Sequence, residues 1–290
     1  MIASIRRAFA FGVLLFAHQV FAQDHSQDVK QFLDSLHYRT GTVEVNGGHA
    51  TLKLTPDFRY LDADDAQRVL ERLWGNPPDN KVLGMLLPAN LSPADKGSWA
   101  VVITYSDDGH VSDEDAAKID YDKMLKDMQE GAREANAERE KRGYHSVELV
   151  GWAAPPRYDA TSYKLYWAKD LAFSGSREHT LNYDIRVLGR GGYLSLNAVS
   201  GMSQLPMVQS KMQDVLAMTD FDAGQRYGDF NASTDKIAAY GIGALVAGTI
   251  AAKAGLFAKL FAVILAAKKF IIAGLIGVGA LLKKFFGRKS

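Results

Sequence analysis

The fifty residues from Gly241 to Ser290 constrain this chain most, because they are apolar, small and basic. Eight of them are Lys or Arg and none is Asp or Glu, while the remainder is mostly Gly, Ala, Leu, Ile, Val and Phe. A segment of this composition is typical of chain that lies in or on a lipid bilayer. We therefore expect the tail to determine where the rest of the protein is located.

We predict that residues 237–290 form a membrane anchor with a basic tail. Residues 237–252 are uncharged, and extension to Ala258 gives a helix long enough for a hydrocarbon core of about 30 Å. Two arrangements stay open beyond it: a basic segment on the membrane surface, which we favour, or a second span. A second span would place two adjacent lysines near mid-bilayer, at about 2.5–3.5 kcal/mol each. The lysines expected to face the membrane are Lys253, Lys259, Lys268 and Lys269.

The charge of the tail also predicts its orientation and a mode of association. Positively charged flanks stay on the cytoplasmic side of a membrane, which predicts a cytoplasmic C-terminus. Small residues recur every four positions between Ala244 and Gly255, a spacing that lets membrane helices approach closely. This pattern predicts a homo-oligomer formed through the membrane helix; the alternative is that Gly and Ala are simply common in this tail.

The N-terminus has the pattern of a secretory signal peptide over residues 1–22. Arg6 and Arg7 precede an apolar stretch, and small residues before and at Ala22 fit the positions that a signal peptidase reads. We expect cleavage after Ala22, with an uncleaved anchor as the alternative. Together with the tail, this places the protein at the bacterial inner membrane, with its main domain in the periplasm.

The charges divide sharply between the tail and the part that precedes it. Of the 34 Lys and Arg residues, two lie in the signal and eight in the tail, whereas all 33 Asp and Glu residues lie between these segments. The exported part, which we delimit as residues 23–236, is therefore acidic. An acidic domain argues against a nucleic-acid partner, because phosphate binding needs clustered Lys and Arg. The chain has no cysteine, which excludes disulfides and thiolate chemistry.

Hydrophobic periodicity predicts an α+β domain, with an antiparallel sheet and flanking helices, followed by the hydrophobic membrane segment. An Asn-Gly turn joins two strands at the N-terminal side, and Gly189 to Gly192 form a hairpin turn between two later strands. We expect Pro155 and Pro156 to separate two strands. The predicted helices cover residues 28–36, 61–74, 112–142 and 205–218, and the predicted strands cover 42–45, 49–54, 99–105, 145–152, 162–169, 180–188 and 193–199.

Motifs for metal or cofactor chemistry match poorly. The acidic stretch from Asp107 to Asp115 is a poor match to an EF-hand calcium loop. Such a loop would begin at Thr104, where the motif needs Asp, and would end at Asp115, where it needs Glu. The histidines show no spacing typical of a zinc site, and no nucleophile elbow or phosphate-binding loop occurs. We therefore predict no cofactor and no metal.

Aromatic residues crowd into the stretch from Trp152 to Tyr183. Such residues can line a groove for a glycan or peptide, although a sheet core explains them as well. Alternation along one strand places Leu165 and Trp167 on one face and Tyr166 on the other. The candidate ligand surface comprises Tyr158, Asp159, Tyr166, Asp184, Arg186 and Arg190.

Several motifs resemble a bacterial family of membrane-anchored proteins known as domain of unknown function 2167. They are residues 74–77 (WGNP), 111–121 (VSDEDAAKIDY), 151–153 (GWA), 156–160 (PRYDA), 164–169 (KLYWAK), 181–190 (LNYDIRVLGR), 194–198 (LSLNA) and 239–241 (AYG). The resemblance covers most of the mature chain and implies an exported domain with a C-terminal membrane segment. It implies no activity and no catalytic residue.

Two functional hypotheses follow. The first is an envelope protein whose exported domain is a non-enzymatic binding or structural module, contacting the lipid bilayer and an envelope protein or glycan. The alternative is a membrane-tethered periplasmic hydrolase that uses carboxylates such as Asp159 and Asp184 as acid and base, which needs the two groups about 5–10 Å apart. A pore built by the tail is a third possibility that rests on composition alone.

Overall fold

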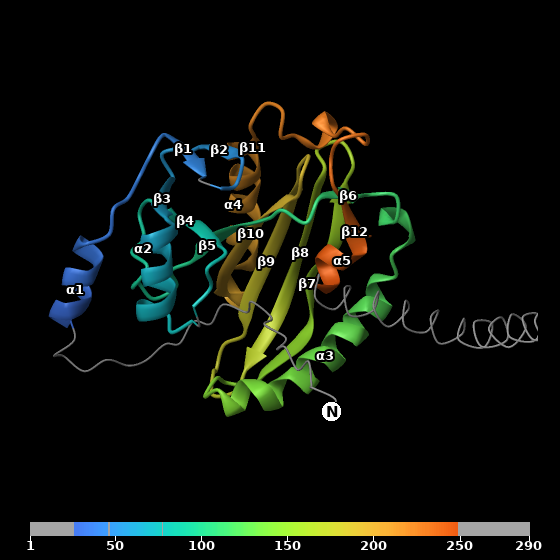
Figure 1. Cartoon of the computed structure of the whole chain (residues 1–290). Coiled ribbons are helices and arrows are strands. Elements are labelled where there is room, and N and C mark those ends of the chain that lie inside the picture. Colours follow the sequence, from blue (N-terminus) through green and yellow to red (C-terminus); the bar gives the residue numbers. More distant parts are fainter. Residues whose placement is uncertain (1–25, 46, 77, 249–290) are drawn as a thin grey trace, which may run out of the picture. The chain divides into compact units, whose positions relative to one another are not determined.

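The computed structural model describes residues 26–45, 47–76 and 78–248. The chain separates into two units, residues 1–247 and residues 248–290. The first unit is an α+β domain built around antiparallel sheets, as predicted (Figure 1). The predicted cleavage site at Ala22 and the predicted membrane-facing lysines lie outside the described residues. Within the described part, no helix has the length and apolar character needed to cross a membrane.

A seven-stranded antiparallel sheet forms the centre of the domain, with the strand order β3-β4-β5-β10-β9-β8-β7. The predicted strands of residues 99–105, 180–188 and 193–199 are confirmed as β5, β9 and β10, and the Gly189–Gly192 turn joins the last two. Gly192 leaves no room for a side chain, since a Cβ there would lie 1.8 Å from the Ser106 carbonyl oxygen. The strands are β3 (Phe58–Asp62), β4 (Val82–Pro88), β5 (Ala100–Ser106), β7 (Val147–Asp159), β8 (Lys164–Phe173), β9 (Thr180–Leu188) and β10 (Tyr193–Gly201).

The prediction that two prolines separate strands is wrong. Pro155 and Pro156 lie inside β7, which runs on to Asp159. The strand tolerates them because it is an edge strand, where a missing N–H need not break a ladder. Its pairing with β8 shifts register at three places, the last between Ala154 and Arg157, so irregular pairing accommodates the two rings.

One face of the large sheet is covered by helix α4 and a small antiparallel sheet. Helix α4 (Leu205–Met218) has the predicted bounds and buries Val208, Met212 and Val215 in the main core. The small sheet has the order β1-β2-β11, and its first two strands pair antiparallel as predicted. Asn46 of the predicted turn lies outside the described residues. Its strands are β1 (Thr42–Val45), β2 (Ala50–Lys53) and β11 (Thr219–Phe221).

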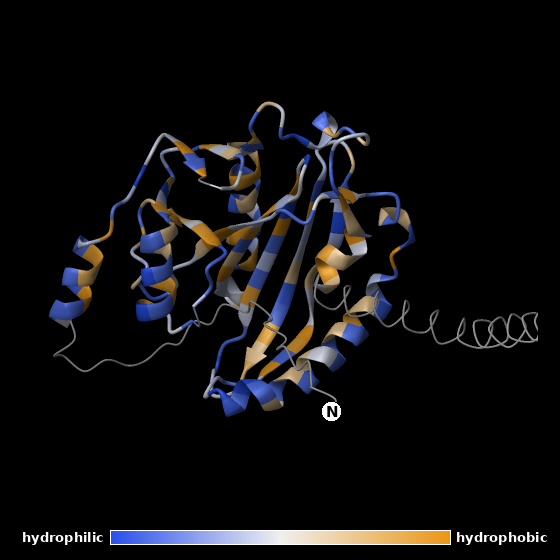
Figure 2. Cartoon of the chain, in the orientation of Figure 1, coloured by the Kyte–Doolittle hydropathy of each residue, from blue (hydrophilic) through white to orange (hydrophobic). Residues whose placement is uncertain are grey.

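Separate groups of helices cover the two ends of the opposite face (Figure 1). At one end, α2 packs on the strands β3 to β5, and at the other end α3 packs on β7. Figure 2 shows bands of hydrophilic residues across the central strands. The helices are α1 (Ser26–Asp34), α2 (Ala63–Arg68), which continues as a π-turn (Val69–Leu73), and α3 (Tyr121–Lys141); short 3₁₀ turns occur at Ala116–Lys118, Met202–Gln204 and Tyr227–Asp229.

The long helix ends as predicted but begins later. Residues around Ser112 were expected to cap it, whereas α3 starts at Tyr121. Its N-cap is Asp120, whose carboxylate accepts a hydrogen bond from the Lys123 N–H at 2.9 Å. Asp120 therefore supplies the cap, and the preceding segment instead forms strand β6 (His110–Ser112) and a 3₁₀ turn.

The boundary predicted at residue 237 falls inside the folded domain. Residues Ile237–Gly241 form β12, which pairs in parallel with β6, and Ile242–Ala247 form the short helix α5. Ile242 and Leu245 are at most 3% exposed and pack against Leu165 and Trp167 of the sheet. An uncharged stretch suits a protein core as well as a bilayer, which is why composition alone placed the boundary too early.

The side chain of Asp115 connects the chain before α3 to the start of α5. One carboxylate oxygen accepts a hydrogen bond from Ile242 N–H at 3.0 Å, and the other accepts one from Gly243 N–H at 3.2 Å. Gly241 lies close beside it, and a Cβ there would lie 2.5 Å from the same carboxylate and displace it. Asp115 therefore caps a helix more than 120 residues away in the sequence.

We expect the substitution Asp115→Ala to destabilise the α5 segment by about 1 kcal/mol, the usual cost of losing a helix cap. Hydrogen exchange should become faster in residues 242–247, whereas the exposed neighbour change Glu114→Ala should leave it unaltered. Equal exchange rates in both variants would show that the carboxylate does not hold α5.

Candidate functional site

A group of polar side chains lies on the central strands, on the sheet face away from α4. Asp184 pairs in register with Asn197 on one side and Trp167 on the other, while Arg186 pairs with Ser195. Residues directly opposite each other in an antiparallel ladder share a face of the sheet. We call the group the polar row; its members are Lys169 of β8, Asn182, Asp184 and Arg186 of β9, and Ser195 and Asn197 of β10.

The alternation of residues along β9 places the polar row on one face. Leu181, Tyr183 and Ile185 are buried in the main core with α4. The residues between them face the other way, because successive side chains of a strand point to opposite faces. A strand that is covered on both faces is usually apolar throughout. Polar residues at every second position of β9 therefore indicate that this face has a role other than packing.

Asp184 is the charged centre of the polar row. It is 3% exposed, and its carboxylate oxygens lie 2.9 Å from Lys169 Nζ and 3.2 Å from Arg186 Nη1. Burial alone would raise the pKa of this carboxyl, but the two cations lower it below its ordinary value. Asp184 is therefore ionised at neutral pH and cannot donate a proton as a general acid.

Two amides extend the network along the strands. Asn182 and Asn197 donate to each other's side-chain oxygens at 3.1 and 3.0 Å. Asn197 also donates to Asp184 Oδ1 at 2.9 Å. These bonds fix the carboxylate and the amides in one orientation, which gives the row a preorganised geometry.

Two buried donors at the polar row lack a hydrogen-bond partner within the described part of the chain. Asp184 Oδ2 also has no hydrogen bond by geometry, but it is paired with Lys169 Nζ at 2.9 Å. Arg186 Nη1 donates to Asp184 and to the Ile185 carbonyl, but its buried Nε has no partner among the described residues, and neither has the indole N–H of Trp167. The guanidinium lies 4.9 Å from the Trp167 ring centre, so the two free donors belong to side chains in contact. Buried donors are almost always bonded in proteins, and their presence here calls for an acceptor.

The structure brings two of the six predicted ligand-surface residues together. Asp184 and Arg186 are neighbours in the polar row, whereas Tyr166 faces α4 in the main core, on the opposite side of the sheet. Leu165 and Trp167 lie on the other face from Tyr166, as alternation predicted. The remaining three form contacts elsewhere: Tyr158 donates to Asp113, Asp159 bonds Thr161 and Ser162 in its own turn, and Arg190 pairs with Asp235.

Sequence reasoning missed the roles of Lys169, Trp167 and the two amides. The available signal was the polar residue at every second position of a strand that is otherwise apolar. It identifies the face of β9, but the partners on β8 and β10 depend on strand register, which no local pattern supplies.

The geometry does not bring together the carboxylates that the hydrolase alternative needs. Asp159 pairs with Lys164 of β8, and Asp184 pairs with Trp167 three residues further on. Asp159 lies on β7 and Asp184 on β9, so the two backbones are two strand spacings apart and offset by three residues along β8. This places them roughly 14 Å apart. In addition, hydrogen bonds from Ser162 and Thr161 lower the pKa of Asp159, so neither carboxyl is suited to act as an acid near neutral pH.

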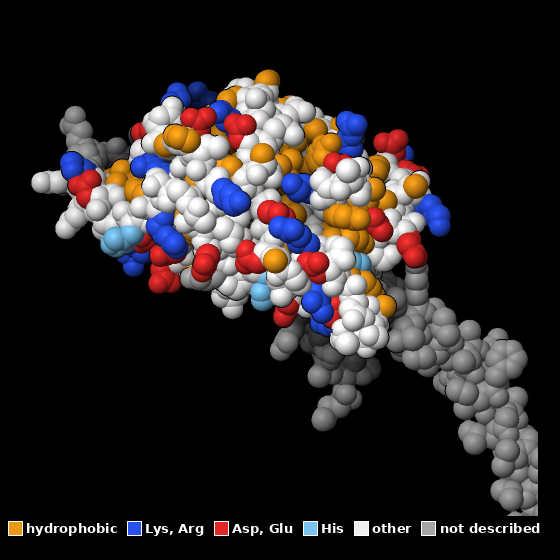
Figure 3. Space-filling model, turned by 90° about the horizontal axis from the view of Figure 1, so that it is seen from above, with side chains coloured by type: hydrophobic (Ala, Val, Ile, Leu, Met, Phe, Trp, Pro, Cys, Tyr) orange, Lys and Arg blue, Asp and Glu red, His pale blue; other side chains and the backbone are white. Residues whose placement is uncertain are grey.

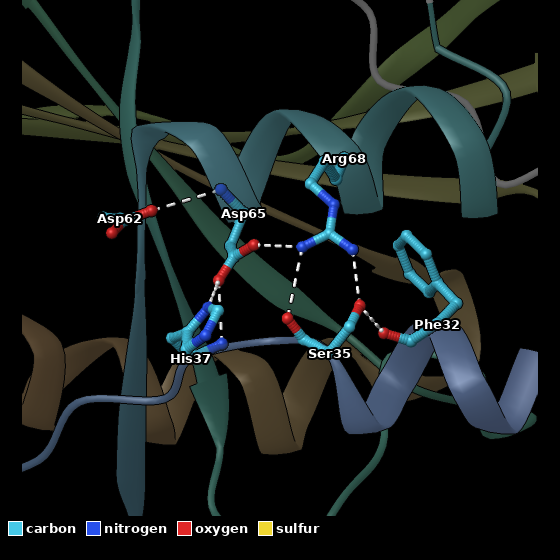
Figure 4. A network of polar contacts seen from close by, with 6 residues as sticks. All are labelled: Phe32, Ser35, His37, Asp62, Asp65 and Arg68. Atoms are coloured by element: carbon cyan, nitrogen blue, oxygen red, sulfur yellow. Dashed lines mark hydrogen bonds and ion pairs between the residues drawn. The ribbon is translucent and has the colours of Figure 1, made fainter.

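A second polar network joins α1 to α2 (Figure 4). Asp65 is 4% exposed and accepts a hydrogen bond from the His37 backbone N–H at 2.7 Å, while His37 Nδ1 lies 3.0 Å from it. Arg68 pairs with the same carboxylate and donates to the Ser35 carbonyl at 3.3 Å. Ser35 Oγ donates to the Phe32 carbonyl rather than to His37. The network therefore attaches one helix to the other and lacks the serine–histidine contact of a nucleophilic triad.

A stack of four aromatic rings lies where β6 meets the segment before β12. Tyr163 stacks on Tyr227 at 4.3 Å, His110 lies 4.2 Å from Tyr227, and Phe230 stacks on the other side of His110 at 3.8 Å between ring centres. Burial lowers the pKa of His110, with backbone groups of Arg190 and Gly189 and the carboxylates of Asp113 and Asp235 opposing the shift. The ring is therefore neutral at pH 7.

This environment makes the stability of the domain pH-dependent. As pH falls below about 6.5, the ordinary value for histidine, His110 of the unfolded chain takes up a proton before the folded one does, so the folded state loses stability. We expect the urea midpoint to drop between pH 7.5 and pH 5.5, and to drop less in a His110→Phe variant. An identical drop in both proteins would assign the effect to other groups.

On the face shown in Figure 3, the described Lys and Arg side chains alternate with Asp and Glu, and no extended basic patch gathers there. Among the described residues, no three or more His, Asp or Glu side chains are grouped so that they could hold a metal ion.

The fold and the site define an α+β domain that buries a charged, donor-rich group on one face of a central antiparallel sheet. The chain belongs to the family described as protein of unknown function (DUF2167), whose model matches residues 37–279. No curated protein matches it.

Solved structures with a distant likeness include two small proteins. One is the solution structure of cyanobacterial PsbP (CyanoP) from Synechocystis sp. PCC 6803, with a TM-score of 0.35 and 11% identity over 65% of this chain and 93% of that chain. The other is the Ran-binding protein Mog1p from Saccharomyces cerevisiae, with a TM-score of 0.34 and 11% identity over 64% of this chain and 96% of that chain.

Proposed function

We propose that this protein is a membrane-tethered binding module of the bacterial envelope. Its domain is presented at the periplasmic face of the inner membrane, and the polar row holds the ligand. The observation that carries the binding role is a pair of buried donors beside Asp184: Arg186 Nε and the Trp167 indole N–H have no acceptor among the described residues. The apolar, basic composition of the tail and the signal-like N-terminus support the location.

A binding role agrees with the chemistry of the row better than catalysis does. Its carboxylate is neutralised by two cations, and its amides are bonded to each other. Groups held in this way recognise a ligand by preorganised hydrogen bonds, whereas a general acid or base would need a pKa near the working pH.

Binding at the row is tested by thermal unfolding of the full chain in detergent, with and without a low-molecular-mass extract of the bacterial envelope. A ligand that binds only the folded state raises the unfolding temperature. The variant Ser195→Tyr places a ring beside Arg186 and should abolish the rise. The matched control Ser210→Tyr, on the exposed side of α4, should keep it. A rise that both variants retain would place binding elsewhere.

The location is tested by protease treatment of intact spheroplasts, with epitopes after Ala22 and after Ser290. Digestion of the domain with protection of the C-terminal epitope is the result expected for one span. Digestion at both epitopes would indicate a hairpin, and protection of the domain would contradict export.

A further inference from the structure

The guanidinium of Arg186 has one edge engaged and one edge without a hydrogen-bond partner among the described residues. Nη1 bonds Asp184 Oδ1 and the Ile185 carbonyl oxygen at 3.2 and 3.1 Å. Nε has no partner among the described residues, and no hydrogen bond from Nη2 to a described residue exists either. The Nε–Nη2 edge is the fork that matches two oxygens of a planar anion.

A further donor without a partner among the described residues belongs to the ring that contacts this guanidinium. Trp167 is 1% exposed, and its indole N–H has no partner within the described part of the chain. The ring lies beneath the guanidinium, with 4.9 Å from Arg186 Cζ to the ring centre. Two buried donors without partners in the described chain thus belong to side chains in contact, and each would gain a hydrogen bond from an acceptor group of a ligand.

The charges around this edge favour an anion of one negative charge. Lys169 and Arg186 are cationic and share one carboxylate, Asp184, and their side chains are at most 15% exposed. The group thus carries one uncompensated positive charge in a poorly solvated place, where unbalanced charge is costly. A carboxylate neutralises this charge, whereas a phosphate near its second ionisation would add excess negative charge.

We infer that the polar row binds a carboxylate group of its ligand, held by the unpartnered Nε–Nη2 edge of Arg186 and the indole N–H of Trp167. This inference rests on the proposed binding role of the row and names the chemistry of its ligand. Asp184 and Lys169 are positioning residues, which fix the guanidinium so that its free edge faces the ligand. The ligand class is a molecule with a free carboxylate, such as a peptide with an exposed C-terminus.

The test uses the four indole N–H signals of the full chain in detergent micelles, recorded by nitrogen-15 NMR. The chain has four tryptophans, and Trp167→Phe identifies the signal of interest. The probes are N-acetylalanine, its uncharged amide, and inorganic phosphate. We expect N-acetylalanine to shift the Trp167 signal saturably, the amide to have no effect, and the other three indole signals to stay in place and report an intact fold.

Arg186→Lys keeps the charge but removes the two-pronged edge, so the affinity for N-acetylalanine should fall at least about tenfold. The control Arg177→Lys, at an exposed arginine outside the row, should bind as the unmodified chain does. An unmoved Trp167 signal, equal shifts with the amide, or unchanged affinity in Arg186→Lys would each overturn the inference. A shift with phosphate alone would overturn the carboxylate assignment.

These outcomes separate the inference from the proposed function. If N-acetylalanine has no effect but envelope extract still raises the unfolding temperature in a Ser195-dependent manner, the binding module stands and its ligand is not a carboxylate. If neither probe nor extract acts through the row, both proposals fail.

Discussion

Asp184→Ala is expected to lower the free energy of unfolding by about 3–5 kcal/mol, the range measured when one partner of a buried ion pair is removed. The variant leaves Lys169 and Arg186 in a place where their side chains are at most 15% exposed, without the carboxylate that both contact. Urea denaturation of the full chain in detergent measures the loss. Because domains are stable by only about 5–15 kcal/mol, a large part of the folding free energy depends on this one group.

The matched control is Asp159→Ala, which removes a carboxylate bonded only within its own exposed turn and should cost far less. The pKa of Asp184 is lowered in the folded state, so its stabilising contribution is present above about pH 3.9, the unfolded value, and is lost as pH falls below it. The difference between Asp184→Ala and the unmodified chain should therefore shrink in acid. Equal losses in the two variants would contradict the buried ion group.

Removal of the whole charged group distinguishes binding from stability. Replacing buried ion networks by apolar residues of similar size is often neutral or stabilising. The combined variant Asp184→Leu, Lys169→Met and Arg186→Met should therefore fold at least as well as Asp184→Ala, while losing the response to ligand. Preserved stability together with a lost ligand response would show that the polar row serves ligand binding rather than folding.

The second large effect on stability is expected when the chain is truncated at Lys236, the end of the domain predicted from composition. A chain that ends at Lys236 lacks β12 and α5, including the buried side chains of Ile242, Leu245 and Val246. Each contributes about 1.5–3 kcal/mol by burial, so their combined loss is comparable with the whole stability of a domain. We expect this truncation to unfold or aggregate, as measured by circular dichroism and size-exclusion chromatography.

A chain that ends at Ala247 is the control for this truncation, because it keeps β12 and α5 with the Asp115 cap. It should show a cooperative unfolding transition. If the chain ending at Lys236 folded equally well, the boundary predicted from composition would be correct and the packing of α5 would be dispensable.

Sequence patterns within a short stretch correctly predicted those elements that depend only on neighbouring residues. Helix α4 has the expected bounds, and the glycine turn after β9 was identified because such turns need residues without a Cβ. Errors occurred where a distant contact decides the structure. Pro155 and Pro156 are tolerated because β7 is an edge strand. Helix α5 belongs to the domain because Asp115 caps it and the sheet packs against its apolar side chains.

The same distinction holds for the site. Asp184 and Arg186 both belong to the ligand surface expected from the sequence, where Asp184 is also a candidate carboxylate for acid–base chemistry. Lys169 and Asn197 could not be selected with them, because each reaches Asp184 across a strand boundary. Register, which depends on the complete sheet, therefore decides which residues form the site.

The most direct test of the binding surface uses the absence of cysteine from the chain. Ser195→Cys introduces a single thiol into the polar row, and Ser210→Cys places one on the exposed side of α4 as a control. Intact spheroplasts are treated with a membrane-impermeant maleimide. We predict labelling of both variants, which shows an exported domain with an accessible row. Labelling at residue 210 alone would show that the row is covered and contradict its role as a binding surface, and labelling of neither would contradict export.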